Sequence, residues 1–131
     1  MSIWTHVAAI VRINDLRLND DDVLDFEKIF GKQLRFDDYG EIWDYAYDHP
    51  DEFLPLGSEG SLTMSVWINP DKSFVAAYTV SIFGDLRDYD NPNKIVEWFK
   101  EKCLNDEFSC RDAAIVAHTD NGKPYFWYSD D

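Results

Sequence analysis

Carboxylates and aromatic rings are interleaved in the middle of the chain, and this stretch offers the most unusual chemistry in the sequence. Between Arg35 and Lys72 there is no Lys or Arg, while nine Asp and Glu residues occur. Carboxylates accept charge-assisted hydrogen bonds from Arg and Lys, and Tyr and Trp are rigid anchors at protein interfaces. The pattern is typical of a surface that occupies the basic groove of a nucleic-acid-handling protein, with carboxylates in the place of phosphates.

We expect this surface to centre on residues 37 to 52, with help from three aspartates further along the chain. The predicted partner-binding residues are Asp37, Asp38, Tyr39, Glu41, Trp43, Asp44, Tyr45, Tyr47, Asp48, Asp51, Glu52, Asp85, Asp88 and Asp90. The alternative is that the rings cover the open face of a sheet and that the acids are merely solvated. The two hypotheses differ in whether the rings lie at the surface.

The residues that could catalyse a reaction form no specific motif. Gly57 and Gly60 lie in a loop that lacks the Gly-Lys-Ser/Thr ending of a phosphate-binding loop. His6, His49 and His118 could act as bases, but packing and surface roles are commoner. His6 and His118 stand near the start and the end of predicted strands, so they could share a sheet face. We expect no catalytic residue and no enzymatic activity.

Metal and cofactor sites are also not expected. Asp85, Asp88 and Asp90 depart from the spacing of a calcium-binding loop and lack its glycine and distal Glu. Cys103 and Cys110 are too few for a disulfide framework, and their spacing matches no common zinc pattern. Cys103 falls on a predicted helix and is expected to fill the core.

The first part of the chain predicts a strand, a helix and an irregular insert. Residues 4–13 are apolar on both alternating sets, which favours a central strand covered on most of both faces. Asn19 to Asp22 is expected to open a helix that Gly31 ends. Residues 36–60 follow no single period, although a short helix is indicated at 41–48.

The second part predicts a hairpin, a helix and a further hairpin. Residues 61–69 and 74–83 alternate strictly and indicate an antiparallel pair. A helix is expected from Asn91-Pro92 onwards, with Ile95, Trp98 or Phe99, and Cys103 in the core. A strand at 111–119, the turn signal Asn121-Gly122 and a last strand at 125–128 follow.

This order predicts one α+β domain over residues 1–131, with the acidic aromatic insert at about 36–60. The expected architecture is ferredoxin-like (βαββαβ plus a C-terminal hairpin strand). It has an antiparallel sheet of about five strands and two main helices on one face. Such a domain is a monomer or a homodimer.

Charge and composition narrow the class of partner. The 131 residues carry a formal net charge of −14, and 45% of them are hydrophobic, which suits a folded core. Clustered Lys and Arg are missing, so neither direct nucleic-acid binding nor an anionic membrane surface is expected. The N-terminus has no signal-peptide pattern and no apolar run is long enough to span a membrane, so we expect a cytoplasmic protein.

The leading hypothesis is a non-enzymatic inhibitor or adaptor that docks on a basic protein, such as a nuclease or another nucleic-acid-binding complex. Its short, acidic character is common among phage or mobile-element inhibitors and immunity proteins. The alternative is a ferredoxin-like small-ligand-binding or regulatory module, either monomeric or dimeric.

Overall fold

The computed structural model describes residues 3–16, 25–34, 41–69, 75–89, 91–104 and 109–129. Five strands, three α-helices and one short 3-10 helix occur within these ranges. In chain order they are β1 (Trp4–Leu16), α1 (Phe26–Phe30), α2 (Glu41–Asp48), the 3-10 helix η2 (Pro50–Glu52), β2 (Thr63–Ile68), β3 (Val75–Arg87), α3 (Pro92–Cys103), β4 (Ser109–Thr119) and β5 (Tyr125–Tyr128).

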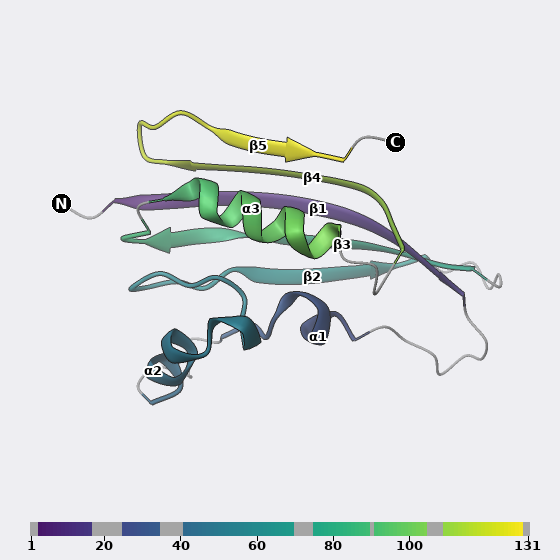
Figure 1. Cartoon of the computed structure of the whole chain (residues 1–131), viewed down its shortest axis with the longest axis horizontal. Coiled ribbons are helices and arrows are strands. Elements are labelled where there is room, and N and C mark those ends of the chain that lie inside the picture. Colours follow the sequence, from purple (N-terminus) through teal and green to yellow (C-terminus); the bar gives the residue numbers. More distant parts are fainter. Residues whose placement is uncertain are drawn as a thin grey trace.

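The strands form one antiparallel sheet in the order β2-β3-β1-β4-β5, which confirms the α+β class. β1 lies in the centre, as its apolar sequence predicted. Both predicted hairpins are present, because β2 pairs with β3 and β4 pairs with β5. In Figure 1, α3 lies across one face of the sheet, and α1 and α2 lie beside β2.

The main core lies between the sheet and the helices. Alternate residues of the three central strands point to this side, among them Ile13, Val80 and Ile115. α1 adds Phe26 and Phe30, and α3 adds a stripe of residues at helical spacing. The α3 residues buried in this core are Ile95, Val96, Phe99 and Cys103.

The first helix begins later than the sequence predicted. Asp25 has an extended backbone, and its side chain accepts a hydrogen bond from the Lys28 amide, so α1 starts at Phe26. The predicted opening at Asn19 to Asp22 lies outside the described residues. Gly31 ends the helix as expected, with φ at 129°.

Three strand predictions need correction. β1 is buried on one face only, because the helices pack on one side of the sheet. Ala8, Ile10 and Arg12, which alternate with its core residues, are exposed, and Ile10 is 50% exposed. β3 continues past the predicted break at Gly84 to Arg87, since the long β1 offers it a partner as far as Trp4. Val66 and Ile68 were expected to point inward and are exposed, because β2 is an edge strand.

Candidate functional site

Helix α2 presents the centre of the predicted surface. Trp43 and Ala46, three residues apart, are buried in a small second core with Leu34 and Phe53. Because this side of the helix faces inward, the remaining side chains face solvent. Asp44, Tyr45, Tyr47, Asp48, Asp51 and Glu52 are exposed on α2 and η2, and we call them the acidic aromatic surface.

Tyr45 is held in place on this surface by two contacts. Its hydroxyl donates a hydrogen bond to Glu52 Oε2 at 2.7 Å, and its ring stacks on His49 with centroids 4.0 Å apart. The hydrogen bond to Glu52 raises the pKa of Tyr45, because it stabilises the protonated phenol. The side chain is therefore ordered before any partner arrives.

Tyr47 borders an apolar hollow of about 200 Å³ next to the acidic side chains. Its hydroxyl donates to the carbonyl of Gly57, which ties α2 to the loop before β2. Tyr89 and Trp98 supply two further rings to the hollow. The rings and the carboxylates of α2 together can receive a side chain that is part cation and part apolar, such as Arg.

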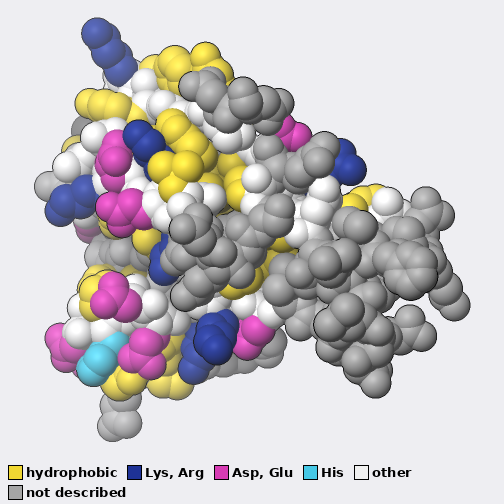
Figure 2. All heavy atoms as spheres, turned by 45° about the vertical axis from the view of Figure 1, so that its right-hand side comes forward, with side chains coloured by type: hydrophobic (Ala, Val, Ile, Leu, Met, Phe, Trp, Pro, Cys, Tyr) yellow, Lys and Arg dark blue, Asp and Glu magenta, His cyan; other side chains and the backbone are white. Residues whose placement is uncertain are grey.

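Two lysines from another part of the chain join the acidic stretch in space. Lys28 and Lys32 line a hollow of about 340 Å³ together with Asp51 and Glu52. The Lys32 amide also donates to the carbonyl of Glu52 at 2.9 Å. In Figure 2, acidic side chains lie over the α2 end of the molecule with Lys or Arg close by. The stretch that lacks Lys and Arg in the sequence therefore has two lysines beside it in the folded protein.

The predicted binding residues fall into several groups. Trp43 is 6% exposed, because its ring is buried in the second core, so it cannot serve as a surface anchor in this structure. Glu41 begins α2, and its side chain lies outside the description. Asp37, Asp38, Tyr39 and Asp90 lie outside the described residues.

Asp88 lies close to the α2 group through the loop that precedes β2. Its Oδ2 accepts a hydrogen bond from the Ser58 hydroxyl at 2.8 Å, and the neighbouring Gly57 carbonyl accepts from Tyr47. Arg87 forms an ion pair with Glu59 at 2.7 Å. The charges at this end of β3 are therefore of both signs.

Asp85 is engaged elsewhere, in a cluster around His6. The two ring nitrogens of His6 lie 2.7 Å from Asp85 Oδ1 and 2.6 Å from Asp120 Oδ1. Only a doubly protonated imidazole can donate to both carboxylates. The hydrogen bonds to Asp120 and then to Asp85 accordingly raise the pKa of His6, and the bond from His6 lowers the pKa of Asp120.

His118 shares the sheet face of His6, as the sequence suggested, with ring centroids 5.0 Å apart. His6, however, has no ring nitrogen left to act as a base or as a metal ligand. Sequence reasoning missed Asp120, which belongs to the turn between β4 and β5. The pairing of His6 with Asp85 in the β1–β3 register would have indicated half of this cluster.

The two cysteine thiols are shielded from solvent to different degrees. Burial raises the pKa of the Cys103 and Cys110 thiols, so both remain protonated at neutral pH. In the described ranges no group of three or more His, Cys, Asp or Glu side chains is arranged to hold a metal ion. Across the same ranges, no helix has the length and apolar character needed to cross a membrane.

Comparison of the chain with protein-family models, curated proteins and solved structures gives no match.

Proposed function

We propose that this chain is a non-enzymatic binding module that docks its acidic aromatic surface on a basic region of another protein. One observation carries the proposal: Tyr45 and Tyr47, 45% and 51% exposed, stand among exposed carboxylates on α2 and η2. Aromatic residues at the centre of a charged surface are the usual anchors of protein interfaces.

The net charge of −14 gives the surface a long-range role. A strongly negative protein attracts a basic partner and raises the rate of encounter, and this effect falls with ionic strength. After encounter, Asp44 and Asp48 would accept hydrogen bonds from Arg or Lys of the partner. The contacts that hold Tyr45 and Tyr47 reduce the entropy lost on binding.

The partner class we propose is a nuclease or another nucleic-acid-binding protein, because such proteins carry basic grooves. Inhibition would follow from occupation of that groove, as expected of a phage or immunity-type inhibitor. Lys28 and Lys32 lie beside Asp51 and Glu52 and offset their negative charge, so the uncompensated carboxylates are those of α2. Asp44 and Asp48 would therefore contribute more than Asp51 and Glu52.

The second candidate is a ferredoxin-like small-ligand-binding or regulatory module. The strand order β2-β3-β1-β4 supports that topology, with β5 as an added edge strand and with α2 and η2 inserted between α1 and β2. The hollow lined by Tyr47, Tyr89 and Trp98 supports a small apolar ligand. Thermal shifts with a metabolite panel, read against a Trp98→Ala variant, would test this candidate.

The experiment that tests the leading proposal measures binding to a panel of basic nucleases and DNA-binding proteins at rising salt. The double variant Asp44→Lys/Asp48→Lys should weaken binding by about tenfold or more. The matched control is Glu97→Lys/Glu101→Lys, which makes the same change of charge on the exposed side of α3. Equal losses in the two variants, or binding that is indifferent to salt, would contradict docking through this surface.

A further inference from the structure

Within the described ranges, no helix or strand packs on the face of the sheet opposite the helices, and we call this the open face. Alternate residues of a strand point to opposite sides, so the partners of Ala8 in the register share its side. Phe83 of β3 and Val116 of β4 are those partners, and Val116 pairs in turn with Phe126 of β5. These side chains form one row across four strands.

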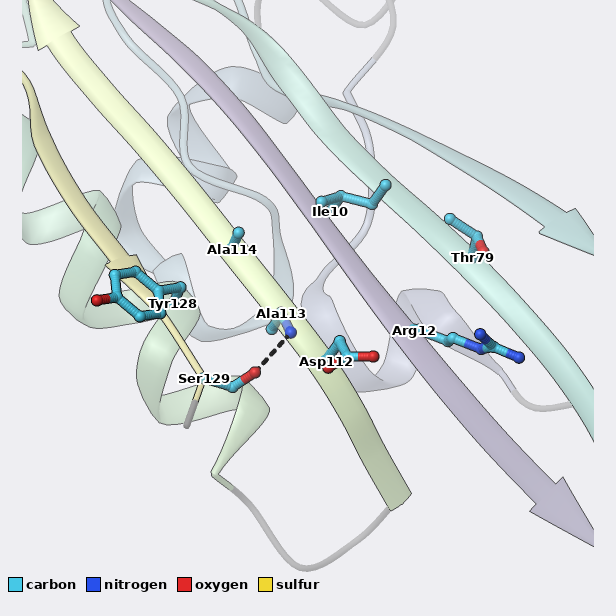
Figure 3. Close-up of a pocket in the computed structure, with 8 residues that line it drawn as sticks. All are labelled: Ile10, Arg12, Thr79, Asp112, Ala113, Ala114, Tyr128 and Ser129. Atoms are coloured by element: carbon cyan, nitrogen blue, oxygen red, sulfur yellow. Dashed lines mark hydrogen bonds between the residues drawn. The ribbon is translucent and has the colours of Figure 1, made fainter. Parts of the chain in front are cut away.

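Two further rows lie along the same face. In the next row, Ile10 is paired with Ser81 and Ala114, and Ala114 is paired with Tyr128. The third row runs from Trp67 of β2 through Thr79 and Arg12 to Asp112 of β4. A shallow hollow of about 380 Å³ lies between the second and third rows (Figure 3).

The open face exposes as much ring surface as the larger apolar patches of monomers. Trp67, Phe83, Phe126 and Tyr128 are between 45% and 67% exposed. At about 200 Å² for each ring, they present together about 450–500 Å². This already lies in the upper part of the range for the largest apolar patch of a monomer, about 300–600 Å². When Ile10, Val116 and a polar rim are added, the area that this face could bury approaches the value of about 800 Å² per partner in a stable dimer.

The charges within the three rows are few and balanced, and the charged pair of His6 and Asp85 lies beyond the row of Ala8 on the same face. Arg12 and Asp112 are the charged members of the three rows, and they are paired in the β1–β4 register. The two side chains do not form an ion pair with each other, and in Figure 3 that of Arg12 extends away from Asp112. A two-fold axis between them would place Arg12 of each copy opposite Asp112 of the other. An isologous interface requires this kind of self-complementarity.

We propose that the open face is the interface of a symmetric homodimer, with a second copy of this chain as its occupant. Two chains of net charge −14 repel each other, so a stable contact between them needs an apolar, charge-poor face. A basic partner would be drawn instead to carboxylates such as those of α2. This inference is independent of the proposed function, because it concerns a different surface.

Sedimentation and light scattering at about 100 µM test the dimer, and the wild type is expected to be dimeric at that concentration. Phe126→Glu should weaken association by about 30-fold or more while circular dichroism shows an intact fold. Asp48→Lys, on the acidic aromatic surface, is the control and should leave the dimer unchanged. Added salt should maintain or strengthen the dimer, since it screens the repulsion between two acidic chains.

A charge exchange tests the two-fold arrangement itself. Arg12→Asp and Asp112→Arg should each weaken self-association, because each places like charges across the axis. A mixture of the two single variants should restore association as a heterodimer, and the double exchange in one chain should restore the homodimer. A monomeric wild type at about 100 µM, or a dimer unaffected by Phe126→Glu, would overturn the proposal.

Discussion

His6 Nε2 and Asp120 Oδ1 lie 2.6 Å apart, although 114 positions of the chain separate the two residues. The second oxygen of Asp120 accepts from the Trp4 amide at 3.2 Å, and the Asp120 amide donates to the Trp4 carbonyl at 3.0 Å. Asp85 binds the other side of the His6 ring. The charged imidazole thus joins the start of β1 to the end of β3 and to the β4–β5 turn.

Replacement of His6 by Gln should reduce stability in a pH-dependent manner. The pKa of His6 is raised in the folded state, so its contribution is fully present below about pH 6.5. That contribution is lost as pH rises through the raised pKa of the folded state. At about pH 5.5 we expect a loss of about 1–4 °C in Tm, because the contacts are partly exposed.

The lowered pKa of Asp120 sets the acid limit of this effect. Its contribution is present above about pH 4, the usual pKa of Asp, and is lost as pH falls through the lowered pKa of the folded state. Calorimetry of wild type and His6→Gln over a pH series should show the largest difference between these limits. His118→Gln is the control, and a pH-independent difference for His6→Gln would refute the charged clamp.

Gly31→Ala should destabilise the protein by about 2–3 kcal/mol. Gly31 has φ at 129°, and a Cβ there would lie 2.5 Å from the Phe53 carbonyl carbon and 2.6 Å from the Leu54 nitrogen. Neither backbone atom can move away without breaking the pairing of Lys32 with Phe53. Gly84→Ala should cost less, since its Cβ would approach no atom closer than 3.4 Å. Urea denaturation gives both values, and equal costs would contradict the explanation by close backbone approach.

Tyr78→Phe should leave stability unchanged or raise it by up to about 1 kcal/mol. The Tyr78 hydroxyl is buried within the described part of the chain without a hydrogen-bond partner, while its ring packs edge-on against Phe26. Thr5→Val is the matched comparison, because the buried Thr5 hydroxyl donates to the Tyr89 carbonyl. That change should cost about 1–2 kcal/mol. Chemical denaturation measures both, and a loss in Tyr78→Phe as large as in Thr5→Val would disprove the difference.

The two thiols should react slowly with a disulfide reagent in the folded protein. Burial raises the pKa of both, so little thiolate is present at about pH 8. Cys110 is half-buried and Cys103 is buried, so Cys103→Ala should retain the faster phase and Cys110→Ala the slower one. Both should react rapidly in urea. A native rate equal to that of a free thiol would contradict this protection.

Local patterns predicted the elements that depend on near neighbours. The alternation in β3 and β4 separated Tyr78, Val80 and Ile115, which lie in the core, from their neighbours, and helical spacing placed Ile95 and Phe99 in the core. The short helix α2 lies at the predicted residues, and Trp43 and Ala46, one turn apart, are buried there. The start of α1 was missed, since several Asp residues can each cap a helix and packing selects among them.

The acidic aromatic surface was predicted only in part. Its tyrosines and its acids are exposed, but Trp43 is buried. A segment in which acids and rings are mixed has no pattern that indicates which rings face the core. Lys28 and Lys32 approach Asp51 and Glu52 through the contact of residue 32 with Phe53. That contact joins segments about twenty residues apart, beyond the range of any local pattern.

The charge of the chain, the alternation of its strands and the α+β class follow from composition and from spacing between near neighbours. Which side of β1 is covered, which charges meet His6 and which rings remain in water depend on long-range packing. Alternation divides a strand into two sides equally well whether one or both are buried. The number of helices that pack on the sheet, and the order of its strands, then select the exposed side.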